Sequence, residues 1–137
     1  MLALLAASIA ALAGCTHSGR TAAKSTPSAA VHGLPVGVVN ATGVPTVVPN
    51  DTAARKNVTV SSCKATKDGW EAAGTATNPG TKQADYTVTV FFTTNGGTVI
   101  GTGQSKVSVK PGAQQPWTIG STFHAPPDTR CVLRGVG

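Results

Sequence analysis

Alternation of apolar and polar residues is the feature that most limits what this chain can fold into. In residues 85–92, DYTVTVFF, every second side chain from Tyr86 to Phe92 is large and apolar. The opposite face of this window carries the polar residues Asp85, Thr87 and Thr89. A period of two is typical of a strand with one face on a core and the other toward water. No window after residue 57 shows the 3.6-residue period of a helix.

Shorter windows in the same region also read as strands. They cover residues 57–65, 69–78, 98–109, 116–123 and 130–136. In the second window Trp70, Ala72, Gly74 and Ala76 share one side. Turn-forming residues separate the windows every eight to twelve residues, so we predict an all-β fold, an antiparallel immunoglobulin-like β-sandwich of about six to seven strands.

Two glycine signals refine this prediction. Asn95-Gly96 is a strong signal for a tight hairpin in which both central residues accept positive φ. Gly101 and Gly103 lie in the strand that follows and would allow a β-bulge there.

The first fourteen residues, MLALLAASIAALAG, are almost entirely apolar. They are fewer than the roughly 20 residues that a membrane-spanning helix needs, and they suit the apolar region of a secretion signal. No basic residue precedes Cys15, so we expect either that the true start lies upstream or that the signal has been trimmed at its N-terminus. A buried apolar helix with a thiol at its end is the alternative, but the segment has no polar face.

Residues 12–15, LAGC, resemble the lipobox of bacterial lipoproteins. The resemblance implies a signal peptide over residues 1–14, a diacylglyceryl group on the thiol of Cys15, and cleavage just before that residue. It therefore implies a membrane anchor, with the protein on the extracytoplasmic face of the cell membrane.

Residues 15–56 are expected to be the lipidated cysteine and a flexible linker, because the small and polar residues at its start bury too little apolar surface to become ordered. Pro35, Pro45 and Pro49 oppose both a helix and a central strand. The alternative for the later, more apolar part is that residues 36–39, VGVV, or 46–48, TVV, dock on the edge of the domain.

Two cysteines remain, Cys63 in the first strand window and Cys131 in the last. After export they would meet an oxidising compartment, where an even pair is expected to form a disulfide. A loop of this size is worth about 4 kcal/mol in the chain-entropy model. In a regular strand Cys63 would lie on the face opposite to Val58 and Val60. Either a bulge between them or a position of the disulfide at the sheet edge would account for this. Redox-active thiols would need an activating neighbour that the sequence does not supply.

Chemistry-bearing side chains are few. The net charge is +6, but basic residues occur at most two in a row, so we expect a solvated surface and no nucleic-acid partner. His17, His32 and His124 have no metal-ligand spacing. Glu71 and Asp85 could approach each other on adjacent strands, without any sign of an acid–base pair. We therefore expect no catalytic residue, no metal site and no cofactor.

The aromatic residues are expected to form the core. Strand phase places Trp70, Tyr86, Trp117 and Phe123 beside aliphatic neighbours. Phe91 points the opposite way from Phe92, so it either meets a second layer or is exposed.

Residues 57–136 resemble the FxLYD-type domain of bacterial envelope lipoproteins. The shared features are the early Cys63, a strand end from Gly74 to Asn78, a turn from Val109 to Gly112, a strand with Trp117, and a late strand with Cys131. The motif that names the family is replaced by residues 90–94, VFFTT, which lack its Tyr and Asp. The resemblance implies an immunoglobulin-like sandwich over residues 57–137 and brings no catalytic residues with it.

These observations favour a non-enzymatic binding or scaffolding module that is anchored to the membrane through Cys15 and contacts an envelope protein. Two alternatives stay open: a structural surface antigen without a specific ligand, and a small cell-wall hydrolase, against which the lack of a convergent polar triad counts. The frequent use of Ala, Gly, Thr and Val, with few Lys, suggests a genome of high GC content, as in an actinobacterium.

Overall fold

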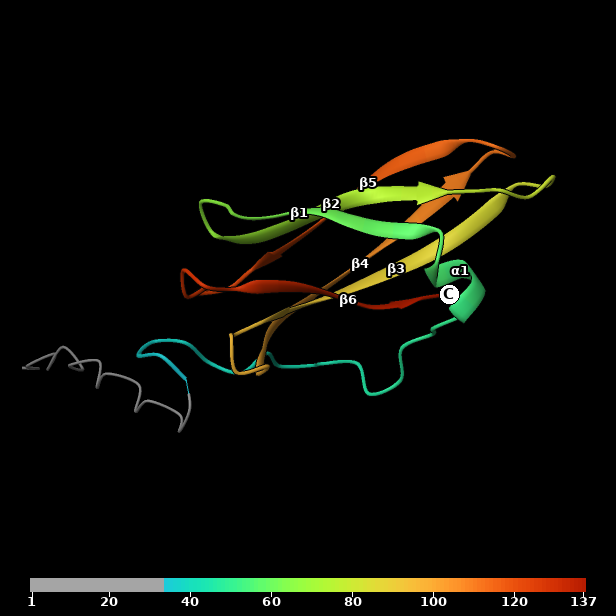
Figure 1. Ribbon diagram of the computed structural model, residues 1–137. Coiled ribbons are helices and arrows are strands. Elements are labelled where there is room, and N and C mark those ends of the chain that lie inside the picture. The colour runs from blue at the N-terminus through green and yellow to red at the C-terminus, as the bar shows by residue number, and fades with distance from the viewer. Residues whose placement is uncertain (1–33) are drawn as a thin grey trace, which may run out of the picture.

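The computed structural model describes residues 34–137, which form two three-stranded antiparallel sheets packed face to face (Figure 1). One sheet has the order β1-β2-β5 and the other β4-β3-β6. The elements are α1 (Thr52–Arg55), β1 (Val58–Ala65), β2 (Gly69–Thr77), β3 (Ala84–Thr93), β4 (Val99–Val109), β5 (Gln114–Thr122) and β6 (Arg130–Val136). The predicted all-β sandwich is confirmed, with six strands.

The core lies between the two sheets, where the alternating residues of β2 and β3 meet. In β2 the residues predicted to share a face, Trp70 to Ala76 in steps of two, are buried. In β3 the predicted core residues, Tyr86 to Phe92 in steps of two, are buried as well, but so are Thr89 and Phe91 between them, so the expectation that the other face of this strand meets water was wrong. The phenol of Tyr86 donates a hydrogen bond to the carbonyl of Thr77 at 3.0 Å, so its polar end is satisfied across the sandwich. Strand phase was therefore readable from the sequence.

The connection between β3 and β4 is a hairpin, as predicted, but its geometry differs. The amide of Thr94 donates to the carbonyl of Thr98 at 2.9 Å, and that of Gly97 donates to the carbonyl of Thr94 at 3.0 Å. Positive φ, 84°, occurs at Gly97 rather than at Gly96. The hairpin is one residue longer than the two-residue form, and the added residue adopts the left-handed conformation that glycine allows.

A bulge occurs in β4, beside the glycines and not at them. Phe92 pairs with Gly101 and Thr93 with Val99, which leaves Ile100 as the extra residue. Gly101 instead lies against the ring of Phe123, and Gly103 lies against the side chain of Ile119. These glycines let β5 and the loop after it approach β4 closely.

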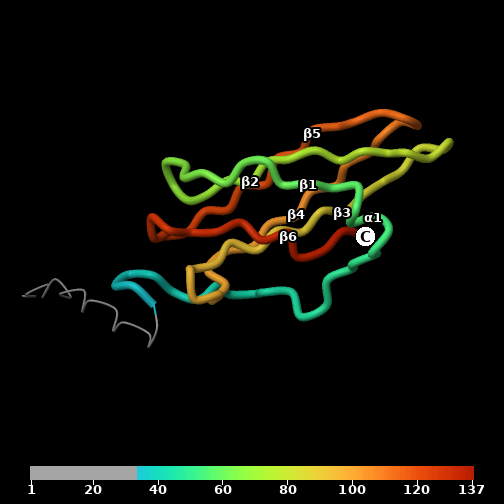
Figure 2. Tube along the Cα trace, viewed as in Figure 1, coloured from blue at the N-terminus to red at the C-terminus, as the bar shows by residue number. Residues whose placement is uncertain are grey.

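Residues 34–51, here called the strap, run along the outer side of the β4-β3-β6 sheet (Figures 1 and 2). Val38 is 3% exposed and belongs to the core cluster together with Leu34. The amide of Ala41 donates to the carbonyl of Val99 at 3.0 Å, and that of Asp51 donates to the carbonyl of Val136 at 2.7 Å. The described part of the expected linker thus docks on the domain, which is the alternative raised for residues 36–39.

The strap leads into α1, a short helix that the sequence analysis did not predict. The carboxylate of Asp51 caps the helix by accepting hydrogen bonds from the amides of Ala53 and Ala54 at 2.7 and 3.0 Å. Arg55 then donates to the carbonyl of Leu133 in β6 at 2.6 Å. This pair of contacts fixes the far end of the strap against the sheet.

The outer side of β3 is covered as a result. Phe91 is 7% exposed, so it meets a second layer, which is one of the two alternatives the sequence left open. Thr89 pairs with Gly135 and Val90 with Leu133, so Arg134 is the extra residue of a bulge in β6. Its guanidinium carbon lies 5.8 Å from the centre of the Phe91 ring, a cation–π arrangement.

Candidate functional site

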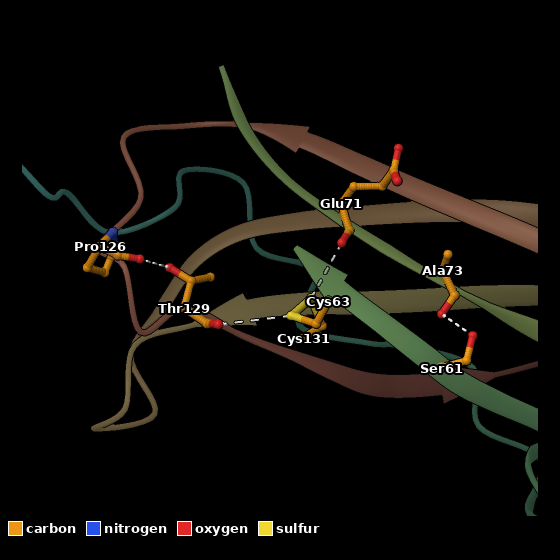
Figure 3. The surroundings of a disulfide bond; sticks show 7 residues. All are labelled: Ser61, Cys63, Glu71, Ala73, Pro126, Thr129 and Cys131. Carbon is orange, nitrogen blue, oxygen red and sulfur yellow. Dashed lines mark hydrogen bonds between the residues drawn. A yellow bond between two sulfur atoms is a disulfide. The ribbon is translucent and has the colours of Figure 1, made fainter. Parts of the chain in front are cut away.

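Cys63 and Cys131 form a disulfide, as predicted, with their Cα atoms 5.7 Å apart. β1 and β6 are edge strands of different sheets, so the bond joins the two sheets at one side of the sandwich (Figure 3). The register of β1 shifts between Val60 and Ser62, which makes Ser61 a bulged residue. Both explanations for the phase of Cys63 therefore apply, because the strand is bulged and lies at the edge.

Two backbone carbonyls lie near the disulfide, which is partly exposed at the sheet edge. The sulfur of Cys63 lies 4.0 Å from the carbonyl oxygen of Thr129, and that of Cys131 lies 4.0 Å from the carbonyl oxygen of Glu71 (Figure 3). Bridged sulfurs carry no hydrogen, so these are packing contacts and not hydrogen bonds. The turn that leads into β6 is held separately, by the hydroxyl of Thr129 donating to the carbonyl of Pro126 at 2.7 Å.

The end of the sandwich where the strap begins carries two adjoining hollows of about 490 and 390 Å³, here called the end groove. The larger is lined by residues 65–70 of the β1–β2 turn, and the smaller by strap residues 39–42 together with residues 100–102 of β4. Thr122, Phe123 and His124 line both and form the ridge between them.

Several contacts hold this ridge in place. The amide of Phe123 donates to the carbonyl of Asp68 at 3.2 Å, which ties the ridge to the β1–β2 turn. The Phe123 ring packs on Phe92, with ring centres 5.5 Å apart and planes inclined by 47°. The ring of His124 lies beside Gly37 of the strap. The ridge is therefore fixed by three segments that are far apart in the sequence.

The end groove can bind by apolar contact and hydrogen bonding. Phe123, which is partly buried, offers aromatic surface, and the largely buried Trp70 lines the larger hollow with its exposed edge. Thr66, Lys67 and Asp68 surround this hollow with polar groups of mixed charge. In the part of the chain that the structure describes, no three His, Cys, Asp or Glu residues are placed to hold a metal ion. The end groove is therefore an open surface of mixed polarity.

Glu71 and Asp85 do not approach each other as the sequence suggested they could. Glu71 lies on β2 and pairs with Lys64 of β1, with 3.1 Å between Nζ and Oε1. Asp85 lies on β3, in the other sheet, and accepts a hydrogen bond from the hydroxyl of Ser108. β2 and β3 follow each other in sequence but belong to different sheets, so the two carboxylates lie on different sheets.

Cys15, His17 and His32 lie outside the described residues. Trp70, Tyr86 and Trp117 are buried in the core as expected, and Phe123 is partly buried against it. The end groove itself was not predicted, since it forms where distant segments meet.

Asn78 follows β2 at the end of the sandwich opposite the end groove, and its side chain connects several backbone segments there. Its side-chain amide donates to the carbonyls of Lys82 and Val109 at 2.7 and 2.9 Å, and its oxygen accepts from the amide of Gly80 at 2.9 Å. Its backbone amide donates to the carbonyl of Ala113 at 3.0 Å. One buried side chain therefore joins the β2–β3 loop to the end of β4.

Comparison of the chain with family models, with curated proteins and with solved structures finds no match. Among residues 34–137, no helix has the length and apolar character needed to cross a membrane.

Proposed function

We propose that this protein is an FxLYD-type lipoprotein, anchored by a diacylglyceryl group on Cys15 to the extracytoplasmic face of the cell membrane. Its sandwich acts there as a non-enzymatic binding or scaffolding module for an envelope protein. Two acyl chains give stable attachment, because each buried CH₂ contributes about 0.8 kcal/mol.

The observation that carries the proposal is the sequence LAGC at residues 12–15, at the end of an apolar run and ahead of a folded domain. The disulfide between Cys63 and Cys131 supports it, because such bonds persist mainly in exported proteins.

The end groove is the binding surface we favour. The strap covers the outer side of the β4-β3-β6 sheet, whereas the groove is open and combines aromatic surface with polar groups. Its ridge is held by a backbone hydrogen bond to the β1–β2 turn, by the packing of Phe123 on Phe92 and by the His124 ring beside Gly37, so a partner would meet a preformed surface with little ordering cost.

The anchor is tested by metabolic labelling with an alkyne fatty acid in a bacterium that processes lipoproteins, with the chain expressed behind a functional signal. We expect label and membrane localisation for the parent protein and loss of both in Cys15→Ser. A Ser18→Ala variant in the predicted spacer is the matched control. Equal labelling of the parent protein and Cys15→Ser would refute the anchor.

The binding surface is tested by placing a photo-crosslinking amino acid at His124, in the groove, or at Lys110, in the β4–β5 turn at the opposite end. We expect one recurrent crosslinked envelope protein from position 124 and none from position 110. Identical patterns from both positions would favour a surface protein without a specific ligand.

A further inference from the structure

We propose that the turn at the start of the strap rests on the lipid bilayer, so that the domain stands on the membrane with this end down. The contact is made by three exposed residues, Pro35, Val36 and Val39, here called the apolar tip. Val39 also lines the smaller hollow of the end groove, so with this end down the protein partner is left the larger hollow, which no strap residue lines. The inference rests on the proposed lipid anchor and adds an orientation and a second membrane contact.

The apolar tip is rigidly presented. Leu34 and Val38, on either side of Val36, are buried in the core. The amide of Val38 donates to the carbonyl of Pro35 at 3.0 Å, and Gly37 has a φ of 83°, which closes a tight turn. Val36 is 78% exposed and Val39 is 54% exposed. Leu34 and Val38 hold the turn in place, while Val36 and Val39 project from it into water. These two exposed side chains contribute little hydrophobic stabilisation to the fold.

The distance along the chain selects this end of the domain. Only eighteen residues separate Cys15 from Leu34, so the proposed anchor joins the domain at the tip end. β4 has 11 residues, so the sandwich is about 36 Å long at 3.3 Å per residue. The anchor therefore tends to hold the tip end closer to the bilayer than the opposite end.

Two valines and a proline bind a bilayer only weakly on their own. Attachment through Cys15 changes this, because tethering turns the second contact into an intramolecular event with a high effective concentration. Interfacial segments bury their apolar side by about 5–10 Å at the boundary of headgroups and acyl chains, which the short tip can reach. The proposal thus needs both the anchor and the tip.

The test uses the lipidated protein in vesicles of phosphatidylethanolamine and phosphatidylglycerol, with and without bromine on the acyl chains. Tryptophan replaces Val36 in one variant and Val47 in the other; Val47 is 85% exposed and lies in the far half of the strap. The parent protein gives the baseline emission of Trp70 and Trp117. We expect brominated lipid to quench the added emission of Val36→Trp, with its maximum shifted to shorter wavelength, and to leave that of Val47→Trp unchanged.

Flotation of the same samples separates the two proposals. Protein that fails to float with the vesicles has no anchor, and the proposed function fails with it. Protein that floats while Val36→Trp is not quenched, or while Val47→Trp is quenched more strongly, overturns the orientation and leaves the anchor standing.

Discussion

Asn78 joins two loops through one buried side chain, and its replacement leaves backbone groups without partners. Truncation to alanine strands the carbonyls of Lys82 and Val109 and the amide of Gly80. We expect Asn78→Ala to lower the free energy of unfolding by about 2 to 3 kcal/mol, because buried polar groups without partners are costly. Urea denaturation of the oxidised protein measures this.

Asn78→Asp sharpens the same prediction. The shape is kept and the amide of Gly80 keeps its acceptor, but the two carbonyls now face an oxygen in place of an N–H donor. We expect a loss at least as large as that of Asn78→Ala, whereas the exposed Asn40→Ala should change little. A stable Asn78→Asp variant would show that side-chain volume, and not hydrogen bonding, matters at this position.

Asp51 makes the start of α1 sensitive to acid. Hydrogen bonds from the amides of Ala54 and Ala53 hold the pKa of its carboxyl below the ordinary 3.8. The folded state therefore binds the proton less tightly than the unfolded state does. The stabilisation is complete above the unfolded pKa and is lost as the pH falls through the folded pKa.

We expect the stability lost between about pH 5 and about pH 3 to be smaller in Asp51→Asn than in the parent protein. The asparagine amide oxygen still caps the helix but does not titrate over this range. Urea denaturation of both proteins at both pH values gives the comparison. An equal loss in the two proteins would mean that this cap does not contribute to the pH dependence.

At the scale of the element, the strap belongs to the fold. Val38 is 3% exposed while Val47 is 85% exposed, so two valines in one segment offer a matched pair. We expect Val38→Ser to lower the free energy of unfolding by about 1.5 to 3 kcal/mol, the range for full burial of an aliphatic side chain. Val47→Ser should be nearly neutral. Equal effects in urea denaturation would show that the strap does not dock as described.

The disulfide acts at the scale of the whole molecule, because it links strands 68 residues apart and joins the two sheets. Replacing Cys63 and Cys131 together by alanine should lower the free energy of unfolding by about 4 kcal/mol in the chain-entropy model. The parent protein under reducing conditions should lose a similar amount. A double variant as stable as the oxidised protein would contradict this.

How much could be predicted from sequence depends on how local the signal is. Strand phase in residues 85–92 and the pairing of Cys63 with Cys131 follow from alternation and from cysteine number. Docking of the strap could not be predicted in the same way. Val38 is buried and Val36 is exposed, but the segment has no regular period that would tell the two valines apart. The end groove depends on Phe123, the strap and the β1–β2 turn meeting in space, which no local pattern encodes.

The path of the strap also has a mechanical meaning. In the proposed anchored protein, a pull on the chain ahead of the domain would load Leu34 first and release the strap and then α1, contact by contact, up to the start of β1. Releasing residues 34–56 would lengthen the tether by about 75 Å at 3.3 Å per residue. Beyond that point the disulfide at Cys63 bypasses the 68-residue stretch to Cys131, so the sandwich behind it bears the load without being drawn out. The strap would serve as a length reserve ahead of a covalently locked body.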